Sequence, residues 1–399
     1  MPDSSHQGQA HEIRFHRTIR ITLMFATLVG AYPRTPLAGQ PFPLRAAYGR
    51  LERGEIDGAG FREVQDELVR ELMGEQIDAG MGILTDGQVR WEDAQTALTR
   101  GLEGFEATGL LRYFDTNTYY RQPRATGEPR WTQPILVDDW RFADGAARQA
   151  ATERGLQPLA VKACLIGPYT LARLSDAGDL GRESLTLALA EALGQEVRAL
   201  VEAGAPVVQV DENALSLIGA DDEAERKLAS EALSRLTSAL DGLTEHHLCL
   251  AVTMGSAEHA GHALLFDQPF HSYLFDLIKG PDNWRLISYA PADRGIVCGV
   301  ADARNTARDD EPVMIWAGRY AASLNGRGRD RVGLAPSTGL EYLPRDRARA
   351  KIQALGEAAR KAGLGKEALG TEIDPRAVDA RSAALGRVER PASRAGGAS

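Results

Sequence analysis

The sequence predicts a (β/α)8 barrel, or TIM barrel, in which eight parallel strands alternate with helices. Strand-like and helix-like stretches alternate over most of the chain, which favours one barrel over two compact units. With 399 residues, 43% of them hydrophobic, the chain can bury one large core. Polar residues also follow the apolar strand-like runs, where a barrel places its functional site.

The predicted strands are short apolar runs that end in polar or glycine-containing turns. The first begins at Met24, and we expect residues 1–23 to be a disordered extension ahead of the functional chain. The predicted strands cover residues 24–30, 81–84, 159–166, 206–212, 245–255, 271–277, 295–301 and 331–335.

Apolar residues three or four positions apart predict the long helices between these strands. These helices cover about 60–79, 182–203, 222–243 and 344–363. Two insertions interrupt the pattern. One is a long loop at 31–59, and the other is a β-hairpin near 106–140 with arms at 113–121 and 130–137. The aromatic hairpin is either a lid or substrate-facing wall, or a satellite cluster packed against the barrel. We expect one barrel over 24–370 and a partly disordered tail over 371–399.

Composition narrows the class of partner. The formal charge of −9 argues against a surface for nucleic acid or an anionic membrane. Three cysteines are too few for a disulfide framework, which indicates a reducing compartment and a cytoplasmic protein. There is no run of 18 apolar residues, so we expect no membrane span. A small-molecule substrate is the expected partner.

The predicted strand exits carry polar, mainly acidic side chains. Such a bowl suits a small cationic or zwitterionic substrate, because a carboxylate can pair with its ammonium group. Adjacent residues on a strand face opposite ways, so only one of Asp211 and Glu212 is expected to reach the pocket unless the strand has already turned. The exit residues are 30–34, Asp86, Gln88, 167–170, Asp211, Glu212, His247, Cys249, Asp276, Asp302, Ser337 and Thr338.

Several of these side chains have a structural alternative to a role in chemistry. Asp86 is either a site residue or a turn residue before Gly87. His247 and Cys249 lie two apart on a strand, so they are either half of a tetrahedral zinc site or a hydrogen-bonded histidine and a buried thiol. Cys164 and Cys298 lie in apolar runs and are expected in the core. Lys162 is either a Schiff-base nucleophile or the partner of a barrel carboxylate.

Six phrases in order resemble the cobalamin-independent methionine synthases, specifically their catalytic barrel and its single-domain relatives. That barrel is similar to uroporphyrinogen decarboxylase. Residues 113–120 also resemble a phrase from the non-catalytic amino-terminal half of the long enzymes, as expected if the two halves share ancestry. The six phrases are residues 29–34, 85–90, 162–170, 209–212, 247–249 and 335–340.

The resemblance implies a zinc-activated methyl transfer. In that family, zinc binds the sulfur of homocysteine and lowers its pKa, and the thiolate takes a methyl group from a methylated folate. The resemblance implies His247 and Cys249 as zinc ligands, with Asp276 near the family's glutamate ligand. Thr338 stands where the family has its second cysteine, and a hydroxyl is a poor zinc ligand beside a thiolate.

The substrate contacts are also implied by the resemblance. Asp211 matches the family's aspartate for the substrate amino group, and Gly30 with Ala31 matches its backbone clamp on the carboxylate. Gln88 stands in place of a family glutamate. Glu212 beside Asp211 completes the predicted substrate-binding set, and Asp86 joins Asp211 as a predicted catalytic residue.

Three functions remain open on the sequence. The leading one is a methionine-synthase-like methyltransferase acting on a homocysteine-like thiol with zinc. A second is a zinc-free lyase or decarboxylase that uses Asp86, Asp211 and Lys162 on a small organic acid. A third is a non-catalytic ligand-binding relative. The methyl donor also stays open between a methylated folate, a methyl-donor protein that carries a corrinoid, and another donor.

Overall fold

The computed structural model describes residues 24–374, and within them the strands close into a parallel barrel. Seven strands form one sheet in the order β1-β11-β10-β9-β8-β7-β6. β2 pairs in parallel with β5, and a bridge from Thr27 to Ile83 joins it to the end of β1. β5 and β6 are one strand interrupted at Lys162, so the ring has eight positions and the predicted barrel is confirmed.

The observed strands are shorter than the predicted ones, because the predicted runs include the turns that leave the barrel. Their bounds are β1 Phe25–Ala26, β2 Ile83–Leu84, β5 Ala160–Val161, β6 Ala163–Ile166, β7 Val208–Asp211, β8 Leu248–Val252, β9 Ser272–Asp276, β10 Gly295–Ala301 and β11 Val332–Pro336. Small and apolar side chains fill the barrel interior, among them Val29, Cys249 and Ala335.

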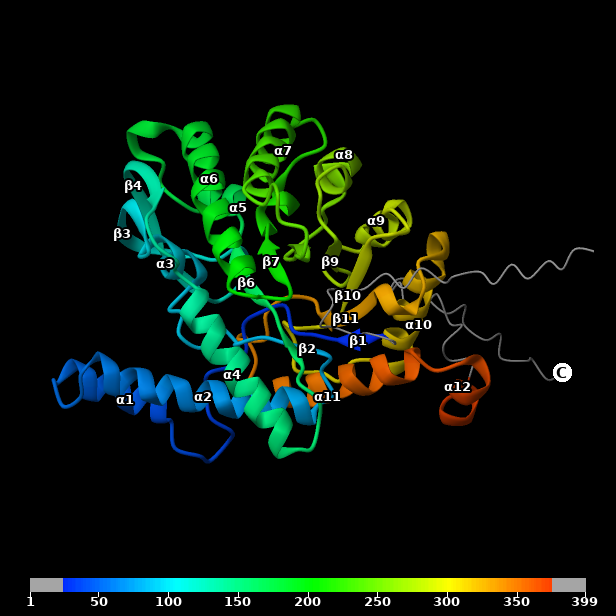
Figure 1. The fold of residues 1–399 in the computed structure, drawn as a ribbon. Helices are drawn as coiled ribbons and strands as arrows, with labels where there is room; N and C mark the ends of the chain where they lie inside the picture. Colours follow the sequence, from blue (N-terminus) through cyan, green and yellow to red (C-terminus); the bar gives the residue numbers. More distant parts are fainter. Residues whose placement is uncertain (1–23, 375–399) are drawn as a thin grey trace, which may run out of the picture.

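The helices surround the strands (Figure 1). Four of them match the predicted helices closely, namely α2 Gly58–Asp78, α6 Arg182–Glu202, α7 Glu223–Ser238 and α11 Arg345–Ala362. The others are α1 Pro43–Glu52, α3 Ala94–Thr99, α4 Val137–Glu153, α5 Pro168–Arg173, α8 His262–Phe266, α9 Asn283–Tyr289, α10 Glu311–Ser323 and α12 Lys366–Glu372. None of the helices in the described range is long and apolar enough to cross a membrane.

The predicted loop at 31–59 is wrong in part, because it contains helix α1. Proline at the first helical turn starts this helix, since its fixed φ suits that position. Only Leu44 and Ala47 of α1 are buried, so the helix carries too few apolar positions to show a clear period in the sequence.

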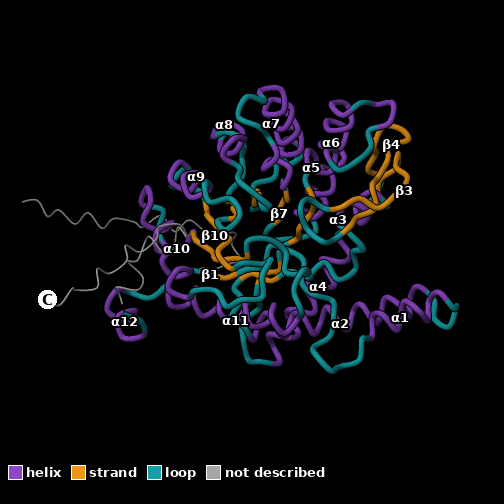
Figure 2. Tube along the Cα trace, turned by 180° about the vertical axis from the view of Figure 1, so that it is seen from behind, coloured by secondary structure: helices purple, strands orange, loops and turns teal. Residues whose placement is uncertain are grey.

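The predicted hairpin insertion is present, with its arms shifted along the chain. β3 Leu102–Arg112 pairs antiparallel with β4 Tyr119–Trp131, and residues 113–118 form the connection. The aromatic stretch assigned to the first arm is therefore mostly the tip, where Phe114 adopts a positive φ of 46°. The stretch assigned to the second arm overlaps β4 only at its start and ends at the first residue of α4. Figures 1 and 2 both show the hairpin beside α6.

The expectation for residues 1–23 and that for most of the tail, 375–399, lie outside the described residues. Residues 371 and 372, at the start of the predicted tail, complete helix α12.

Candidate functional site

A pocket of about 310 Å³ opens where the strands end. It is lined by residues that end or follow β1, β2, β6, β7, β8 and β11, so it lies at the carboxyl end of the barrel. This is the end at which barrel enzymes carry their chemistry. Five predicted site residues line it, namely Gly30, Ala31, Gln88, Asp211 and Thr338.

The hairpin forms part of the pocket wall. Tyr113, Tyr119 and Tyr120 line the pocket together with Trp91 and Tyr342. The rings of Tyr113 and Tyr120 are nearly perpendicular, at 87°, with centroids 6.2 Å apart. The hairpin therefore contributes aromatic surface to a pocket whose floor is polar.

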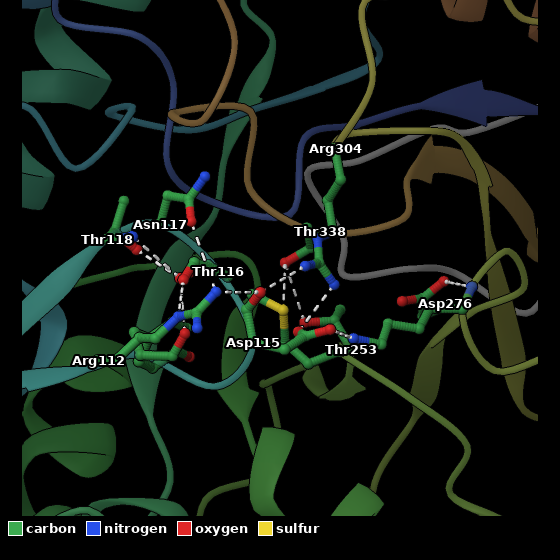
Figure 3. A network of polar contacts seen from close by, with 12 residues as sticks. Arg112, Asp115, Thr116, Asn117, Thr118, Thr253, Asp276, Arg304 and Thr338 are labelled. Carbon is green, nitrogen blue, oxygen red and sulfur yellow. Dashed lines mark hydrogen bonds and ion pairs between the residues drawn. The ribbon is translucent and has the colours of Figure 1, made fainter.

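The tip of the hairpin is tied to the opposite side of the barrel mouth. Asp115 forms ion pairs with Lys279, which follows β9, and with Arg304, which follows β10, the latter at 2.9 Å (Figure 3). Arg304 Nη2 also donates to the Asp115 carbonyl at 3.1 Å. Hydrogen bonding from Lys279 and Arg304 lowers the pKa of Asp115 to about 2. The hairpin thus spans the mouth and is fixed at its far end.

Asp211 is a half-buried carboxylate at the pocket floor. Gln209 Nε2 donates to Asp211 Oδ1 at 2.6 Å and to the Val29 carbonyl at 2.6 Å. Burial raises the pKa of Asp211 to about 7, while the hydrogen bond from Gln209 and the charge of Lys162 lower it. Desolvation is thus the main influence on this carboxyl, and Gln209 and Lys162 oppose it.

Lys162 lies in the barrel interior behind this carboxylate. Its Nζ donates to the Leu28 carbonyl at 2.6 Å and to Gln209 Oε1 at 2.5 Å. Lys162 does not line the main pocket, so the structure does not present it to a ligand as a Schiff-base nucleophile. The alternative prediction is that Lys162 pairs with a barrel carboxylate. Lys162 reaches Asp211 only through Gln209, which stands between them.

The sequence predicts that Glu212 contacts the substrate, but this side chain does not line the pocket. Its carboxylate accepts from Tyr169 N at 3.0 Å, Thr170 N at 2.8 Å and Thr170 Oγ1 at 2.6 Å, at the first turn of α5. The reason is the alternation of a strand, which turns Glu212 away from the face that presents Asp211. Burial raises the pKa of Glu212 to about 7.

Asp86 is a turn residue beside the pocket and does not line it. Its Oδ1 accepts from the Gln88 backbone N at 3.0 Å, and its pKa is raised by burial. Together with Lys162 it lines a separate cavity of about 20 Å³. The turn holds Gln88 at a positive φ of 52° next to Gly30, so Asp86 acts on the pocket through Gln88.

The four predicted zinc ligands do not form one cluster. His247 precedes β8 and Cys249 is its second residue, so both lie toward the amino end of the barrel, and both contact the Ser272 hydroxyl. Asp276 ends β9 and accepts from the backbone N of Ile278 at 3.0 Å and Lys279 at 2.9 Å. Across residues 24–374, no three His, Cys, Asp or Glu side chains are grouped closely enough to hold a metal ion. The predicted ligand set does not fit zinc.

Hydroxyl and amide groups occupy the carboxyl ends of β8 and β11. Thr253 Oγ1 lies 3.2 Å from Thr338 Oγ1 and donates to Asn213 Oδ1 at 2.8 Å (Figure 3). Asn213 Nδ2 in turn donates to the Tyr113 hydroxyl at 3.0 Å. This network joins three strand ends to the hairpin and satisfies its own polar groups.

Sequence reasoning missed several lining residues. Thr253 and Met254 follow β8, and their position at a strand exit could have identified them. Glu341 also lines the pocket, and its side chain is open to solvent. Glu341 lies one residue beyond the phrase at 335–340, so only the fold brings it to the site.

The fold and the pocket define a (β/α)8 barrel protein with a pocket at the carboxyl end of its strands. The chain belongs to the family described as "Cobalamin-independent synthase, N-terminal domain", whose model matches residues 84–315, more than half of its length. The family resemblance predicted from the sequence is thereby confirmed. The matched residues include the hairpin, whose tip resembles the amino-terminal half of the long enzymes.

Relatives and solved structures agree with this assignment. The methionine synthase of Sulfurisphaera tokodaii is 28% identical over 329 residues, which cover 82% of this chain and 88% of that protein. The methionine synthase of Saccharolobus solfataricus is 26% identical over 350 residues, 85% of this chain and 94% of that one.

The fold is shared with a B12-independent methionine synthase from Shewanella sp. W3-18-1, solved in complex with selenomethionine. The TM-score is 0.67 at 17% identity, and the match covers 85% of this chain and 97% of that one. A putative vitamin-B12 independent methionine synthase from Listeria monocytogenes gives 0.65 at 16% identity, over 86% and 99% of the two chains.

Proposed function

We propose that this protein is a methionine-synthase-like methyltransferase that acts on an amino acid with a thiol side chain, such as homocysteine. The observation that carries the proposal is the placement of Asp211 in a pocket that also contains the Gly30–Ala31 turn. A carboxylate and a backbone turn at one end of a pocket can receive the ammonium and carboxylate groups of an amino acid. The names of the curated relatives support the reaction class.

The remaining lining residues suit the rest of such a ligand. The side chain of an amino acid held at Asp211 would extend toward the hydroxyls of Thr253 and Thr338 or toward the aromatic wall of the hairpin. A pocket of about 310 Å³ exceeds the needs of one small amino acid, which leaves space for part of a second substrate. A methylated folate and a methyl-donor protein remain predictions from the family resemblance.

We assign no step to zinc, because the predicted ligands lie apart and Thr253 and Thr338 bond to one another. The same contact favours a second candidate, in which the protein binds an amino acid without transferring a methyl group. The lyase alternative gains no such support. It requires Asp86 and Lys162 at the substrate, and both lie outside the main pocket.

The two candidates separate in a binding and turnover experiment on the purified chain. Calorimetry with L-homocysteine and L-methionine measures binding, and mass spectrometry detects methionine formed from homocysteine with methyltetrahydrofolate or methylcobalamin. Binding with turnover supports the methyltransferase, and binding without turnover supports the second candidate.

A pair of aspartate variants tests the site itself. Asp211→Asn is expected to weaken amino-acid binding by about tenfold or more, because it removes a charge paired with the ligand ammonium. Asp302→Asn, at the end of β10 and outside the pocket, is the matched control and should bind within about twofold of wild type. Equal binding by wild type and Asp211→Asn, or no binding by wild type, would overturn the proposed function.

A further inference from the structure

Lys162 is a buried amine that does not line the main pocket. Its side chain is 4% exposed and sits at the break between β5 and β6. Nζ donates to Leu28 O and to Gln209 Oε1, and neither acceptor is a carboxylate. A buried ammonium that contacts no carboxylate directly is costly, so its contacts must compensate for the lost water.

The lysine fixes the orientation of the Gln209 amide. Because Oε1 accepts from Lys162, Nε2 must face Asp211 Oδ1 and the Val29 carbonyl, both at 2.6 Å. The opposite orientation would place NH2 against the lysine and an oxygen against two acceptors, and every contact would be repulsive. Gln209 is fully buried, so water cannot compensate. The amide therefore has one allowed orientation, which Lys162 and the Val29 carbonyl determine together.

We propose that Lys162 is a positioning residue for the pocket, and that through the Gln209 amide it orients the Asp211 carboxylate and keeps it ionised for a ligand ammonium. The inference rests on the proposed function, because it assumes a ligand that bears an ammonium group. Lys162 acts through Gln209 and need not touch the ligand.

The charges around Asp211 show why such support is needed. Burial is the main influence that favours the neutral acid, and the negative charge of Glu341 adds to it. Gln209 and Lys162 act in the opposite direction. The titratable groups that interact with Asp211 are Lys162, Glu341, Glu212, Tyr113, Cys164 and Cys249. Lys162 is the cation of this set, so its loss leaves burial and negative neighbours opposed only by the Gln209 hydrogen bond.

The affinity for an ammonium ligand should depend on pH. Asp211 must be ionised to pair with an ammonium, so affinity is present above the pKa of Asp211 and is lost as pH falls through it. With a pKa of about 7, wild type should lose affinity between about pH 8 and pH 6. Without Lys162 the pKa rises, so the same loss should occur at higher pH.

The binding experiment uses L-methionine as the probe, because it has an ammonium group and no thiol to titrate. Calorimetric affinities from about pH 5.5 to pH 9 are compared for wild type, Lys162→Met and Lys162→Arg. Lys162→Met should shift the midpoint upward by about one unit, which lowers the affinity at pH 7 about fivefold, and the affinity should recover at higher pH. Lys162→Arg keeps the charge and should lie within about threefold of wild type.

A matched control removes a different buried lysine. Lys351 is also 4% exposed and pairs with Asp309 at 2.9 Å, away from the pocket. Lys351→Met should leave the pH profile of methionine binding unchanged. If Lys162→Met fails to fold, Gln209→Leu breaks the same chain of contacts while keeping the lysine, and it should shift the midpoint in the same direction.

A second measurement needs no ligand. The side-chain carboxyl of Asp211, assigned in ¹³C NMR spectra by its loss in Asp211→Asn, is titrated in wild type and in the variants. An upward shift of its midpoint in Lys162→Met, and in Gln209→Leu, supports the inference, and an unchanged midpoint in both overturns it. If the midpoint shifts as stated but wild type does not bind methionine, the proposed function fails and the role of Lys162 in the charge of Asp211 stands.

Discussion

Replacing Glu196 with glutamine is expected to destabilise the protein by several kilocalories per mole, although the change removes no volume. Glu196 lies on α6 and is fully buried. Its Oε2 accepts from Trp131 Nε1 at 2.7 Å and from Ile135 N at 2.8 Å, and its Oε1 accepts from Leu136 N at 2.8 Å. One carboxylate thus holds the end of β4 and the residues that lead into α4.

The size of the effect follows from the number of donors. Glutamine has one side-chain oxygen, so its NH2 group must face either the single donor or the pair of donors. In the better orientation one hydrogen bond to a charged acceptor is lost and one buried N–H is left without an acceptor, at a cost of about 2–3 kcal/mol. The two bonds that remain are weakened because their acceptor is now neutral, so we expect a total loss of about 3–4 kcal/mol.

Urea unfolding followed by circular dichroism measures this loss. Glu191→Gln is the matched control on the same helix, where the glutamate is 66% exposed and pairs with Arg235 at 2.7 Å. Exposed pairs contribute little, so the control should lose less than about 1 kcal/mol. A free energy of unfolding for Glu196→Gln within about 0.5 kcal/mol of the control would refute the reasoning, because the three donors would then have other acceptors.

Three further predictions concern the pocket, the zinc hypothesis and the core. In Gly30→Ala the new Cβ would lie 2.7 Å from Gln88 Nε2, so Gln88 must move and methionine affinity should fall about tenfold. The control Gly109→Ala places its Cβ in open space and should bind methionine as wild type does. Cys249→Ala should leave metal content unchanged by mass spectrometry, leave methionine affinity within about twofold of wild type, and cost about 1–2 kcal/mol in thermal unfolding, because the thiol is core volume. Arg327→Met should cost about 3 kcal/mol or more in urea unfolding, because it strips a fully buried guanidinium from four backbone carbonyls.

Each of these has a contrary result. Unchanged binding by Gly30→Ala would show that Gln88 does not contribute to the ligand site. Loss of bound metal in Cys249→Ala would return that thiol to the list of ligands. A loss below about 1 kcal/mol for Arg327→Met would mean that water reaches the carbonyls that the guanidinium now satisfies.

The barrel was predictable because buried parallel strands are apolar along their whole length and repeat between amphipathic helices. β10 was placed to the residue, since an apolar run bounded by polar residues marks both of its ends. Helix α1 and the hairpin register were not predictable in the same way. α1 buries two side chains only, and the hairpin aromatics that line the pocket lie in the connection and at the start of β4.

The predicted residues that line the pocket stand where an apolar run ends. Some of the predicted residues that lie away from it stand earlier along their strand. Gly30, Gln88 and Asp211 follow or end apolar runs, so the barrel rule places them correctly. His247 and Cys249 belong to a similar run but stand at its beginning, and the chain reaches the pocket only at Thr253. Sequence spacing shows which side chains share a face, but it does not show at which end of the barrel they lie.

The resemblance also gave most weight to the catalytic half of the long enzymes, whereas the matching family model describes the amino-terminal domain. Thr338 lies beyond the matched residues 84–315, and its hydroxyl lies 3.2 Å from that of Thr253 as part of a network of hydroxyls.

The hairpin enters and leaves the barrel side by side, because Leu102 pairs with Trp131 at its base. It could therefore be exchanged for a short turn, or for a hairpin of different sequence, without altering the closure of the strands. The polar groups at the barrel strand ends would stay in place while the aromatic wall changed. Substrate range in this architecture can thus diverge by replacement of one contiguous segment, which makes residues 102–131 a natural unit for grafting between relatives.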